Sequence, residues 1–275
     1  MIEIKDLGFS YGVNWVLKNI TMNLEEGKIY GLLGENGVGK TTLLTLLCGL
    51  KEASRGSITI DGRNPFDRSP LLLEEIFYLQ ETSSPKPFVA DEYVAEKGKF
   101  WNKFSMDKFH ELMKEFETDP AKKMNKMSAG QLKKTYISFA LACNCKYIFM
   151  DEPTNGLDIP SKTQFRKAIM KHTADDSVIV ISTHQVRDLE NIIDPIIILD
   201  KQDVLLNASV EEIESKLYFD YGTIAKPDAL WTESVPGGFI QVRSNTEGME
   251  SKINVEALFN AVHTNKEAIK SIFTK

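Results

Sequence analysis

Apolar and polar positions alternate in two short stretches near the start of the chain. Residues 2–9 and 57–61 both show this alternation, which is typical of half-buried strands. Between them, residues 29–33 form a short apolar run, and residues 41–48 read as a helix with an almost wholly apolar surface. The run at 29–33 therefore predicts a buried strand, and the segment after it predicts a buried helix.

The same strand and helix patterns return further along the chain. Short apolar runs predict strands at 76–79, 147–150, 178–182 and 196–199, and a helix is expected from residue 129 to about 143. Strands that alternate with helices favour an α/β fold with a mainly parallel, twisted sheet. We expect the N-terminal strands to form a small antiparallel β subdomain that flanks this sheet.

A helical block interrupts the strand pattern. Residues 85–127 are rich in Lys, Glu, Phe and Met, and they contain two amphipathic segments, 88–101 and 107–116. We interpret this block as a helical subdomain inserted into the α/β core.

The last part of the chain differs again from the core. A helix is predicted over 210–217, and residues 218–243 favour two small strands with loops. Asn254 is expected to cap a helix over 255–263, and 266–272 predicts a final helix. We therefore divide the chain into residues 1–217 and a small α+β extension over 218–275.

Composition narrows the class of protein. The chain has 275 residues, 42% of them hydrophobic, and a formal net charge of -6, so disorder is not expected and charge offers no argument for a nucleic-acid partner. The densest apolar stretch, 192–199, is far shorter than the roughly 20 residues of a membrane span. With no signal peptide and three unpaired cysteines, we expect a cytoplasmic protein.

The segment from Gly34 to Thr41 matches the phosphate-binding pattern G-x-x-x-x-G-K-[ST] in full. A buried strand precedes it and a helix follows, which is the context that this P-loop requires. Its glycines let backbone N–H groups turn towards phosphate oxygens, and the helix N-terminus adds its positive end. Lys40 would reach the β- and γ-phosphates, and the Thr41 hydroxyl would ligate Mg²⁺.

Two carboxylates follow a later buried strand. Asp151 and Glu152 end the apolar run that begins at Tyr147, so they should lie at the carboxyl edge of the sheet, where ligands bind in open α/β folds. Asp151 can hold the Mg²⁺ shell. Glu152 can act as general base for the attacking water.

Ser128 and Gln131 form a capping box at the start of the predicted helix after the insertion. They belong to the run Met127-Ser128-Ala129-Gly130-Gln131, which resembles the signature of the ATP-binding cassette (ABC) family, usually Leu-Ser-Gly-Gly-Gln. The resemblance covers roughly residues 2–206 and implies an ATPase that works as a head-to-tail dimer. It also implies that this helix start binds the γ-phosphate of ATP on the opposite subunit.

Other family elements follow in the family's order. Tyr11 matches the aromatic residue that stacks on adenine, and Gln80 matches the glutamine that contacts Mg²⁺ and the attacking water. Asp158 matches the aspartate that lies across the dimer interface, and His184 the histidine that contacts the γ-phosphate.

The resemblance implies three sets of site residues. The catalytic set is Glu152, His184, Gln80 and Lys40, and the Mg²⁺ ligands are Thr41, Gln80 and Asp151. The ATP contacts are Tyr11, Asn36, Gly37, Gly39, Lys40, Thr41, Thr42, Ser128, Gly130, Gln131 and Asp158.

Three residues depart from the family pattern. Ala129 replaces the first signature glycine, Met127 replaces leucine, and Lys134 stands where an arginine is common. The serine and second glycine, which make the phosphate contacts in the family, are both present, so we expect an active enzyme.

Several other ATPase and GTPase classes fit less well. A GTPase would need an Asn-Lys-x-Asp motif, and a DNA-repair cassette would need a long coiled coil between Gln80 and Ser128. A ribosome-acting protein would normally carry two cassettes. A soluble ABC-type ATPase with a non-transport partner is the alternative left open.

The reading that remains is the ATP-binding subunit of an ABC transporter. It would pair with a second cassette, identical or not, and would reach the inner face of the membrane only through separate transmembrane permease subunits. The apolar residues Phe88, Val89, Tyr93, Phe100 and Trp101 are expected to supply a docking cleft for the permease. The extension resembles that of bacterial exporter-type ATPase subunits, which favours export. We expect the extension to be dispensable for ATP binding, because the nucleotide motifs end by His184.

Overall fold

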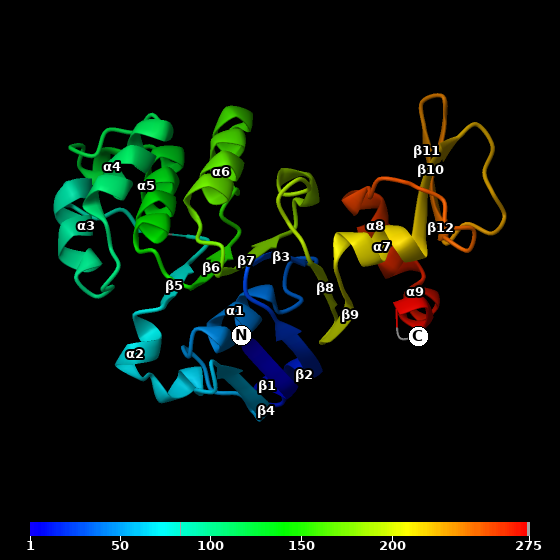
Figure 1. Cartoon of the computed structure of the whole chain (residues 1–275), viewed down its shortest axis with the longest axis horizontal. Coiled ribbons are helices and arrows are strands. Elements are labelled where there is room, and N and C mark those ends of the chain that lie inside the picture. Colours follow the sequence, from blue (N-terminus) through cyan, green and yellow to red (C-terminus); the bar gives the residue numbers. More distant parts are fainter. Residues whose placement is uncertain (83, 274–275) are drawn as a thin grey trace.

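The computed structural model describes residues 1–82 and 84–273 (Figure 1). A six-stranded sheet runs through its centre in the order β5-β6-β7-β3-β8-β9. Every neighbouring pair is parallel except β8 and β9. The strands are β3 (Lys28–Leu33), β5 (Ile76–Leu79), β6 (Tyr147–Asp151), β7 (Val178–Thr183), β8 (Ile196–Asp200) and β9 (Asp203–Ala208). The mainly parallel sheet predicted from the sequence is confirmed.

Strand β9 has no counterpart in the sequence prediction. Its turn from β8 consists of Lys201 and Gln202, which both have positive φ angles of 40° and 84°. Two-residue hairpin turns of this kind usually contain Asn or Gly. Because Lys and Gln are not typical of such turns, the sequence did not predict this hairpin.

A three-stranded antiparallel sheet flanks the central one, as predicted. Its order is β2-β1-β4, formed by β1 (Ile2–Tyr11), β2 (Asn14–Leu24) and β4 (Arg55–Ile60). The short segments η1 (Pro65–Asp67) and α2 (Pro70–Leu73) connect it to β5.

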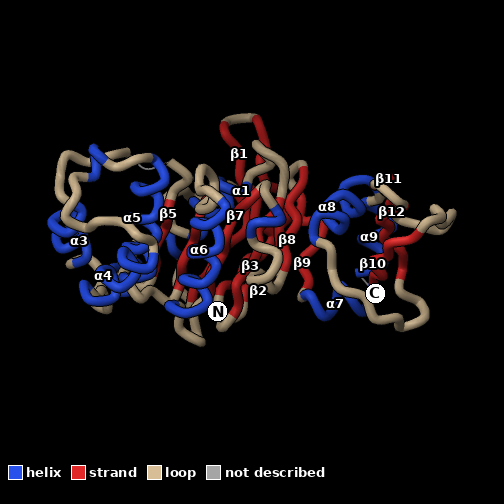
Figure 2. Tube along the Cα trace, turned by 90° about the horizontal axis from the view of Figure 1, so that it is seen from above, coloured by secondary structure: helices blue, strands red, loops and turns tan. Residues whose placement is uncertain are grey.

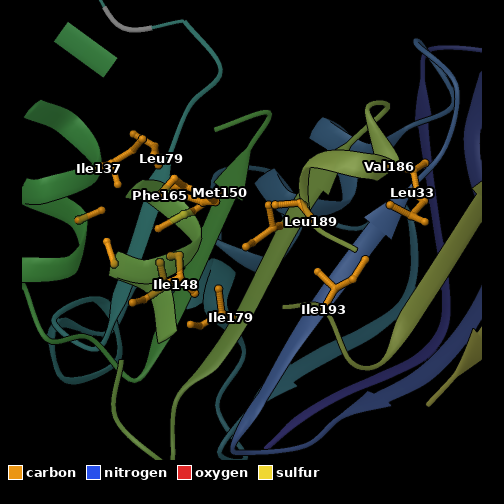
Figure 3. Close-up of a cluster of buried hydrophobic side chains, with 14 of the residues drawn as sticks. Leu33, Leu79, Ile137, Ile148, Met150, Phe165, Ile179, Val186, Leu189 and Ile193 are labelled. Atoms are coloured by element: carbon orange, nitrogen blue, oxygen red, sulfur yellow. The ribbon is translucent and has the colours of Figure 1, made fainter. Parts of the chain in front are cut away.

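Side chains of the central strands alternate between two hydrophobic clusters. On β6, Tyr147 and Phe149 belong to a cluster shared with α1 (Lys40–Leu47) and the antiparallel sheet. Ile148 and Met150 belong to the other cluster, shared with α5 (Ala129–Ala142) and α6 (Ile159–His172) (Figure 3). This period of two buries both faces of the sheet, so the strands read as continuous apolar runs.

The predicted helical block is confirmed and lies beyond β5, at one end of the molecule (Figures 1 and 2). It contains α3 (Ala90–Gly98), α4 (Met106–Glu115) and η2 (Met124–Lys126), which leads into α5. No described helix is long and apolar enough to cross a membrane.

The C-terminal extension lies at the opposite end of the molecule, beyond β9 (Figure 2). The prediction of two strands there is wrong, because three strands pair in the order β10-β12-β11. The aromatic run that opens the extension forms one edge strand, and Pro236-Gly237 turns the chain between the other two. After α7 (Val210–Lys216), the elements are β10 (Leu217–Gly222), β11 (Trp231–Val235), β12 (Gly238–Ser244), α8 (Val255–Thr264) and α9 (Lys266–Phe273).

The extension shares buried surface with the rest of the chain. Leu258 and Val262 of α8 belong to the same hydrophobic cluster as Ile196 and Ile198 of β8. The Asn254 side chain caps α8, as predicted, by accepting a hydrogen bond from the Ala257 N–H. The two regions therefore pack as one body around a common core.

Candidate active site

The carboxyl ends of β3, β6 and β7 meet at one edge of the central sheet. The loop after β3 leads to α1, β6 ends in Asp151, and β7 is followed by His184. A cavity of about 480 Å³ lies over this edge. It is lined by Tyr11, Val16, Asn36, Gly37, Gly39, Lys40, Thr41, Thr42, Glu81, Asp151, Glu152, Asn155 and His184. Most residues that the sequence predicted for the site are thus brought together.

The loop before α1 is shaped to receive an anion. Gly39 precedes the helix with φ 114°, and a Cβ there would lie 2.9 Å from the Leu17 side chain, so this position requires glycine. No side chain caps α1. The N–H groups of its first turn, and the positive end of its dipole, therefore suit a phosphate.

Lys40 projects from the first turn of α1 into this loop. Its Nζ donates to the carbonyl oxygens of Gly34 at 2.7 Å and Glu35 at 3.0 Å, and lies 3.6 Å from Glu152 Oε1. Burial lowers the pKa of Lys40, and the carboxylates of Glu152 and Asp151 act in the opposite direction. The Lys40 amine thus lies buried between the carbonyl oxygens of the loop and the carboxylate of Glu152.

Asp151 is buried and carries two short hydrogen bonds. Thr41 Oγ1 donates to Asp151 Oδ2 at 2.6 Å, and Ser182 Oγ donates to Oδ1 at 2.5 Å. A threonine hydroxyl and a carboxylate in contact are hard oxygen donors of the kind that Mg²⁺ prefers. The residues present therefore fit a magnesium ion shared by the start of α1 and the end of β6.

Glu152 has an unusual backbone for a residue other than glycine. Its φ is 45°, in the left-handed region, and its N–H donates to the backbone oxygen of Ser182 at 3.2 Å and to Ser182 Oγ at 3.1 Å. Its Oε1 lies 2.9 Å from His184 Nδ1. The turn thus places the carboxylate of Glu152 between Lys40 and His184.

Tyr11 forms the outer wall of the cavity. The ring is half exposed, packs edge-on against Phe9 at 4.9 Å between centroids, and has Lys51 Nζ 4.8 Å from its centre. The hydrogen bond to Lys51 lowers the pKa of Tyr11. The ring is thus held by its neighbours and remains accessible from the cavity.

Gln80 does not lie where the sequence analysis expected it. It follows β5 directly and lines a different cavity, next to the helical block. The next residue, Glu81, lines the cavity of Lys40, and its Oε1 accepts a hydrogen bond from Asn155 Nδ2 at 3.0 Å. A carboxylate therefore occupies the place that we expected the glutamine to fill.

The signature residues lie outside this cavity. Ser128 Oγ accepts from the Gln131 N–H at 3.2 Å and Gln131 Oε1 accepts from the Ser128 N–H at 3.2 Å, which confirms the capping box. Ser128 is exposed, and a Cβ on Gly130 would meet nothing within 4 Å. The start of α5 is therefore open to another molecule.

Asp158 also lies outside the cavity and is exposed. Its Oδ1 accepts a hydrogen bond from the Ser161 N–H at 2.9 Å, so it caps α6. Four lining or supporting residues were missed from the sequence: Val16, Glu81, Asn155 and Ser182. Two of these had a signal, because Ser182 directly precedes the Thr183-His184 pair and Asn155 begins the run Asn155-Gly156-Leu157-Asp158 that resembles a family element.

The sequence profile of the ABC transporter family matches residues 17–155. The chain therefore belongs to the ABC transporter family, as an ATP-binding subunit. It is 29% identical over 222 residues to the ABC transporter ATP-binding protein YtrB of Bacillus subtilis, covering 78% of this chain and 74% of that one. It is also 29% identical over 224 residues to the methionine import ATP-binding protein MetN of Clostridium tetani, covering 78% and 70%.

Solved cassette structures share the fold. The structure of an ATP-binding subunit of an ABC transporter matches with a TM-score of 0.70 and 25% identity, over 78% of this chain and 92% of that one. The dimeric bacterial cassette MJ0796 matches with a TM-score of 0.67 and 23% identity, over 76% and 98%.

Proposed function

We propose that this chain binds and hydrolyses ATP in a head-to-tail dimer, and that it thereby powers transport through separate membrane-spanning subunits. The observation that carries the proposal is the gathering of Lys40, Asp151, Glu152 and His184 at one sheet edge. Each group has a distinct task there.

The phosphates of ATP would lie on the first turn of α1. The N–H groups of that turn and the Lys40 ammonium would bind their oxygens, which orients the γ-phosphate towards Glu152. Thr41 and Asp151 would hold Mg²⁺, which neutralises phosphate charge when bound. Glu81 is the further oxygen donor on this side, in place of Gln80.

Glu152 is placed to act as general base. Its carboxylate would accept a proton from the attacking water, and His184, 2.9 Å away, would orient that carboxylate and contact the γ-phosphate. A backbone held in a strained conformation is common where a catalytic side chain must point in one direction.

Tyr11→Ala is expected to weaken ATP binding by roughly 1–3 kcal/mol, by analogy with base stacking on aromatic side chains. Stacking tolerates any base, so GTP should lose about as much affinity as ATP. Titration of the purified chain with fluorescent ATP and GTP analogues would measure both. Unchanged affinity in Tyr11→Ala would remove this ring from the site, and strong discrimination against GTP would require another residue that reads the base edge.

The exposed start of α5 supports the dimer. Ser128 and Gly130 present a helix N-terminus away from the cavity of their own subunit, so they would contact ATP bound to a second cassette. The exposed Asp158 and its neighbour Ile159, which is 81% exposed, would lie in the same interface.

A second cavity, of about 340 Å³, supports docking on a permease. It lies between the end of β5, α3 and α5, and Tyr93, Phe100 and Trp101 line it, as does Gln80. Phe88 and Val89 are not among its lining residues. We infer that this cleft receives a short helix of a transmembrane subunit, which would hold the chain at the inner face of the cell membrane.

Phe100→Asp is expected to reduce membrane recruitment without reducing ATPase activity. Phe100 is 69% exposed, so the change should not unfold the chain, and loss of an aromatic contact costs about 1–2 kcal/mol or more, roughly 5- to 30-fold in affinity. The membrane-bound fraction in cells of the natural host and the ATPase activity of the purified chain would be measured separately. Phe88→Asp is the matched control, because Phe88 is 53% exposed but lies outside the cleft.

Normal recruitment of Phe100→Asp would refute docking at this cleft. If the unaltered chain never associates with a membrane protein, that result would favour the alternative of a soluble ATPase with a non-transport partner. The direction of transport rests on weaker grounds. The extension resembles those of exporter ATPase subunits, which favours export, whereas one relative, MetN, is named for methionine import. Transport of labelled substrates into or out of vesicles decides the direction.

A further inference from the structure

A lysine on α5 joins three segments that meet beside the proposed active site. Lys133 Nζ donates to the backbone oxygen of Glu81 and, at 3.3 Å, to the backbone oxygen of Glu152. Asn155 completes the link, because its N–H donates to the same oxygen of Glu152 at 3.2 Å and its side chain donates to the Glu81 carboxylate. The segment after β5, the turn after β6 and α5 are thus tied together.

Lys133 contacts the backbone of Glu152, the residue in the left-handed conformation. Such a backbone costs about 1–3 kcal/mol for a residue other than glycine and persists only where its surroundings hold it. At Glu152 the N–H is held by Ser182 and the carbonyl by Lys133 and Asn155. Of these partners, Lys133 is the charged one, and hydrogen bonds from charged donors are about twice as strong as neutral ones.

The side chain of Lys133 is partly buried. The side chain borders a small cavity with Leu132, Ala129 and Gly156. Burial lowers the pKa of Lys133, and the carboxylates of Glu81, Asp151 and Glu152 oppose that effect. A long, partly buried cation is costly unless its donors are satisfied, and the two carbonyl oxygens accept from two of the three N–H donors of Lys133.

The position of Lys133 along α5 places this contact close to the proposed dimer interface. Ser128, the exposed N-cap that would contact ATP on the partner subunit, lies within the same first two turns of the helix. The same helix contacts the backbone of this subunit's own Glu152 at its side and, in the proposed dimer, would contact the partner's nucleotide at its end.

We propose that Lys133 is a positioning residue that fixes the Glu152 peptide and so couples closure of α5 on the partner's ATP to alignment of the base in its own site. The proposal rests on the proposed function, because it assigns Glu152 as the base. It concerns the rate of the chemical step and leaves ATP affinity to the loop around Lys40.

The test compares steady-state ATP hydrolysis by full-length Lys133→Met, Lys133→Arg and Lys134→Met. Lys133→Met keeps the length of the side chain and removes the donor, and kcat should fall roughly 10- to 100-fold, as for a misplaced catalytic group, with KM changed less than about twofold. Lys133→Arg should recover most of the rate, since it restores a charged donor. Lys134→Met is the matched control, because the neighbouring Lys134 Nζ donates to the backbone oxygen of Phe116 at 3.2 Å, away from the cavity.

Three outcomes would overturn the proposal: normal kcat in Lys133→Met, equal losses of rate and ATP affinity, or an equal loss of rate in Lys134→Met. If Lys133→Met does not fold, Lys133→Gln replaces it and should give an intermediate rate. Glu152→Gln, measured in parallel, separates the two claims. Normal turnover by Glu152→Gln would remove Glu152 from the role of base, on which the proposal rests, whereas its inactivity beside a normal Lys133→Met would refute only the role of Lys133.

Discussion

Glu152→Gln is expected to bind ATP normally and to lose most of its turnover, by roughly 10² to 10⁴, the usual contribution of a general base. The amide keeps the size of the carboxylate and cannot accept the proton of the attacking water. His184 Nδ1 can still hydrogen-bond to the amide oxygen, so the geometry of the cavity should survive. Phosphate release from saturating Mg-ATP measures the loss.

The same variant should trap a dimer. Unhydrolysed ATP would remain between Lys40 of one subunit and Ser128 of the other, and size-exclusion chromatography at micromolar protein and millimolar ATP would show the doubled mass. A variant that also carries Ser128→Arg should stay monomeric, because the exposed helix start is then obstructed. A monomeric Glu152→Gln under these conditions would contradict the head-to-tail arrangement, and full turnover would remove Glu152 from the role of base.

Lys40→Ala is expected to lose most of its affinity for ATP. The charged hydrogen bonds of Lys40 to phosphate are worth about 1.5–3 kcal/mol, or roughly 10- to 150-fold in affinity. Binding of ATP at 100 times Kd should stabilise the unaltered chain by about 2.7 kcal/mol, and this gain should fall to about 0.3–1.4 kcal/mol in the variant at the same ATP concentration.

A thermal-shift titration measures that gain directly. The shift caused by ATP is compared with each variant's own melting temperature, since Lys40 is buried beside Glu152 and its removal also changes the stability of the free protein. Lys5→Ala is the control, because Lys5 is an exposed lysine of β1 that pairs with Glu3. An equal ATP response in Lys40→Ala and the unaltered chain would exclude the phosphate role.

The sequence predicted the central strands, the P-loop and the inserted helices because those features depend on local patterns. A buried strand followed by glycines, lysine and threonine has few alternatives, and the capping box at Ser128 is encoded within four residues. The parallel sheet then follows from the alternation of strands and helices. These are the parts of the fold that short-range chemistry specifies.

Gln80 and Glu81 show where local patterns stop being sufficient. Both residues are polar and both follow the apolar strand β5, so the sequence alone cannot decide which one turns towards Lys40. The choice depends on how the chain leaves the sheet, and contacts with Asn155 and Lys133, distant in sequence, determine that path. Strand β9 and one of the three strands of the extension were missed for a related reason, since such strands are completed by a partner strand and not by their own pattern.

The common core of the extension and the cassette affects how truncated proteins should be interpreted. Buried residues of α8 pack with those of β8, and Lys266 of α9 is paired with Asp200, which is only 4% exposed. A chain cut before the extension would present apolar surface to water and leave a buried carboxylate without its cation. Aggregation or low yield of such a chain would then report on solubility, and genetic loss of the extension would resemble loss of the whole protein even if no regulatory signal passes through it.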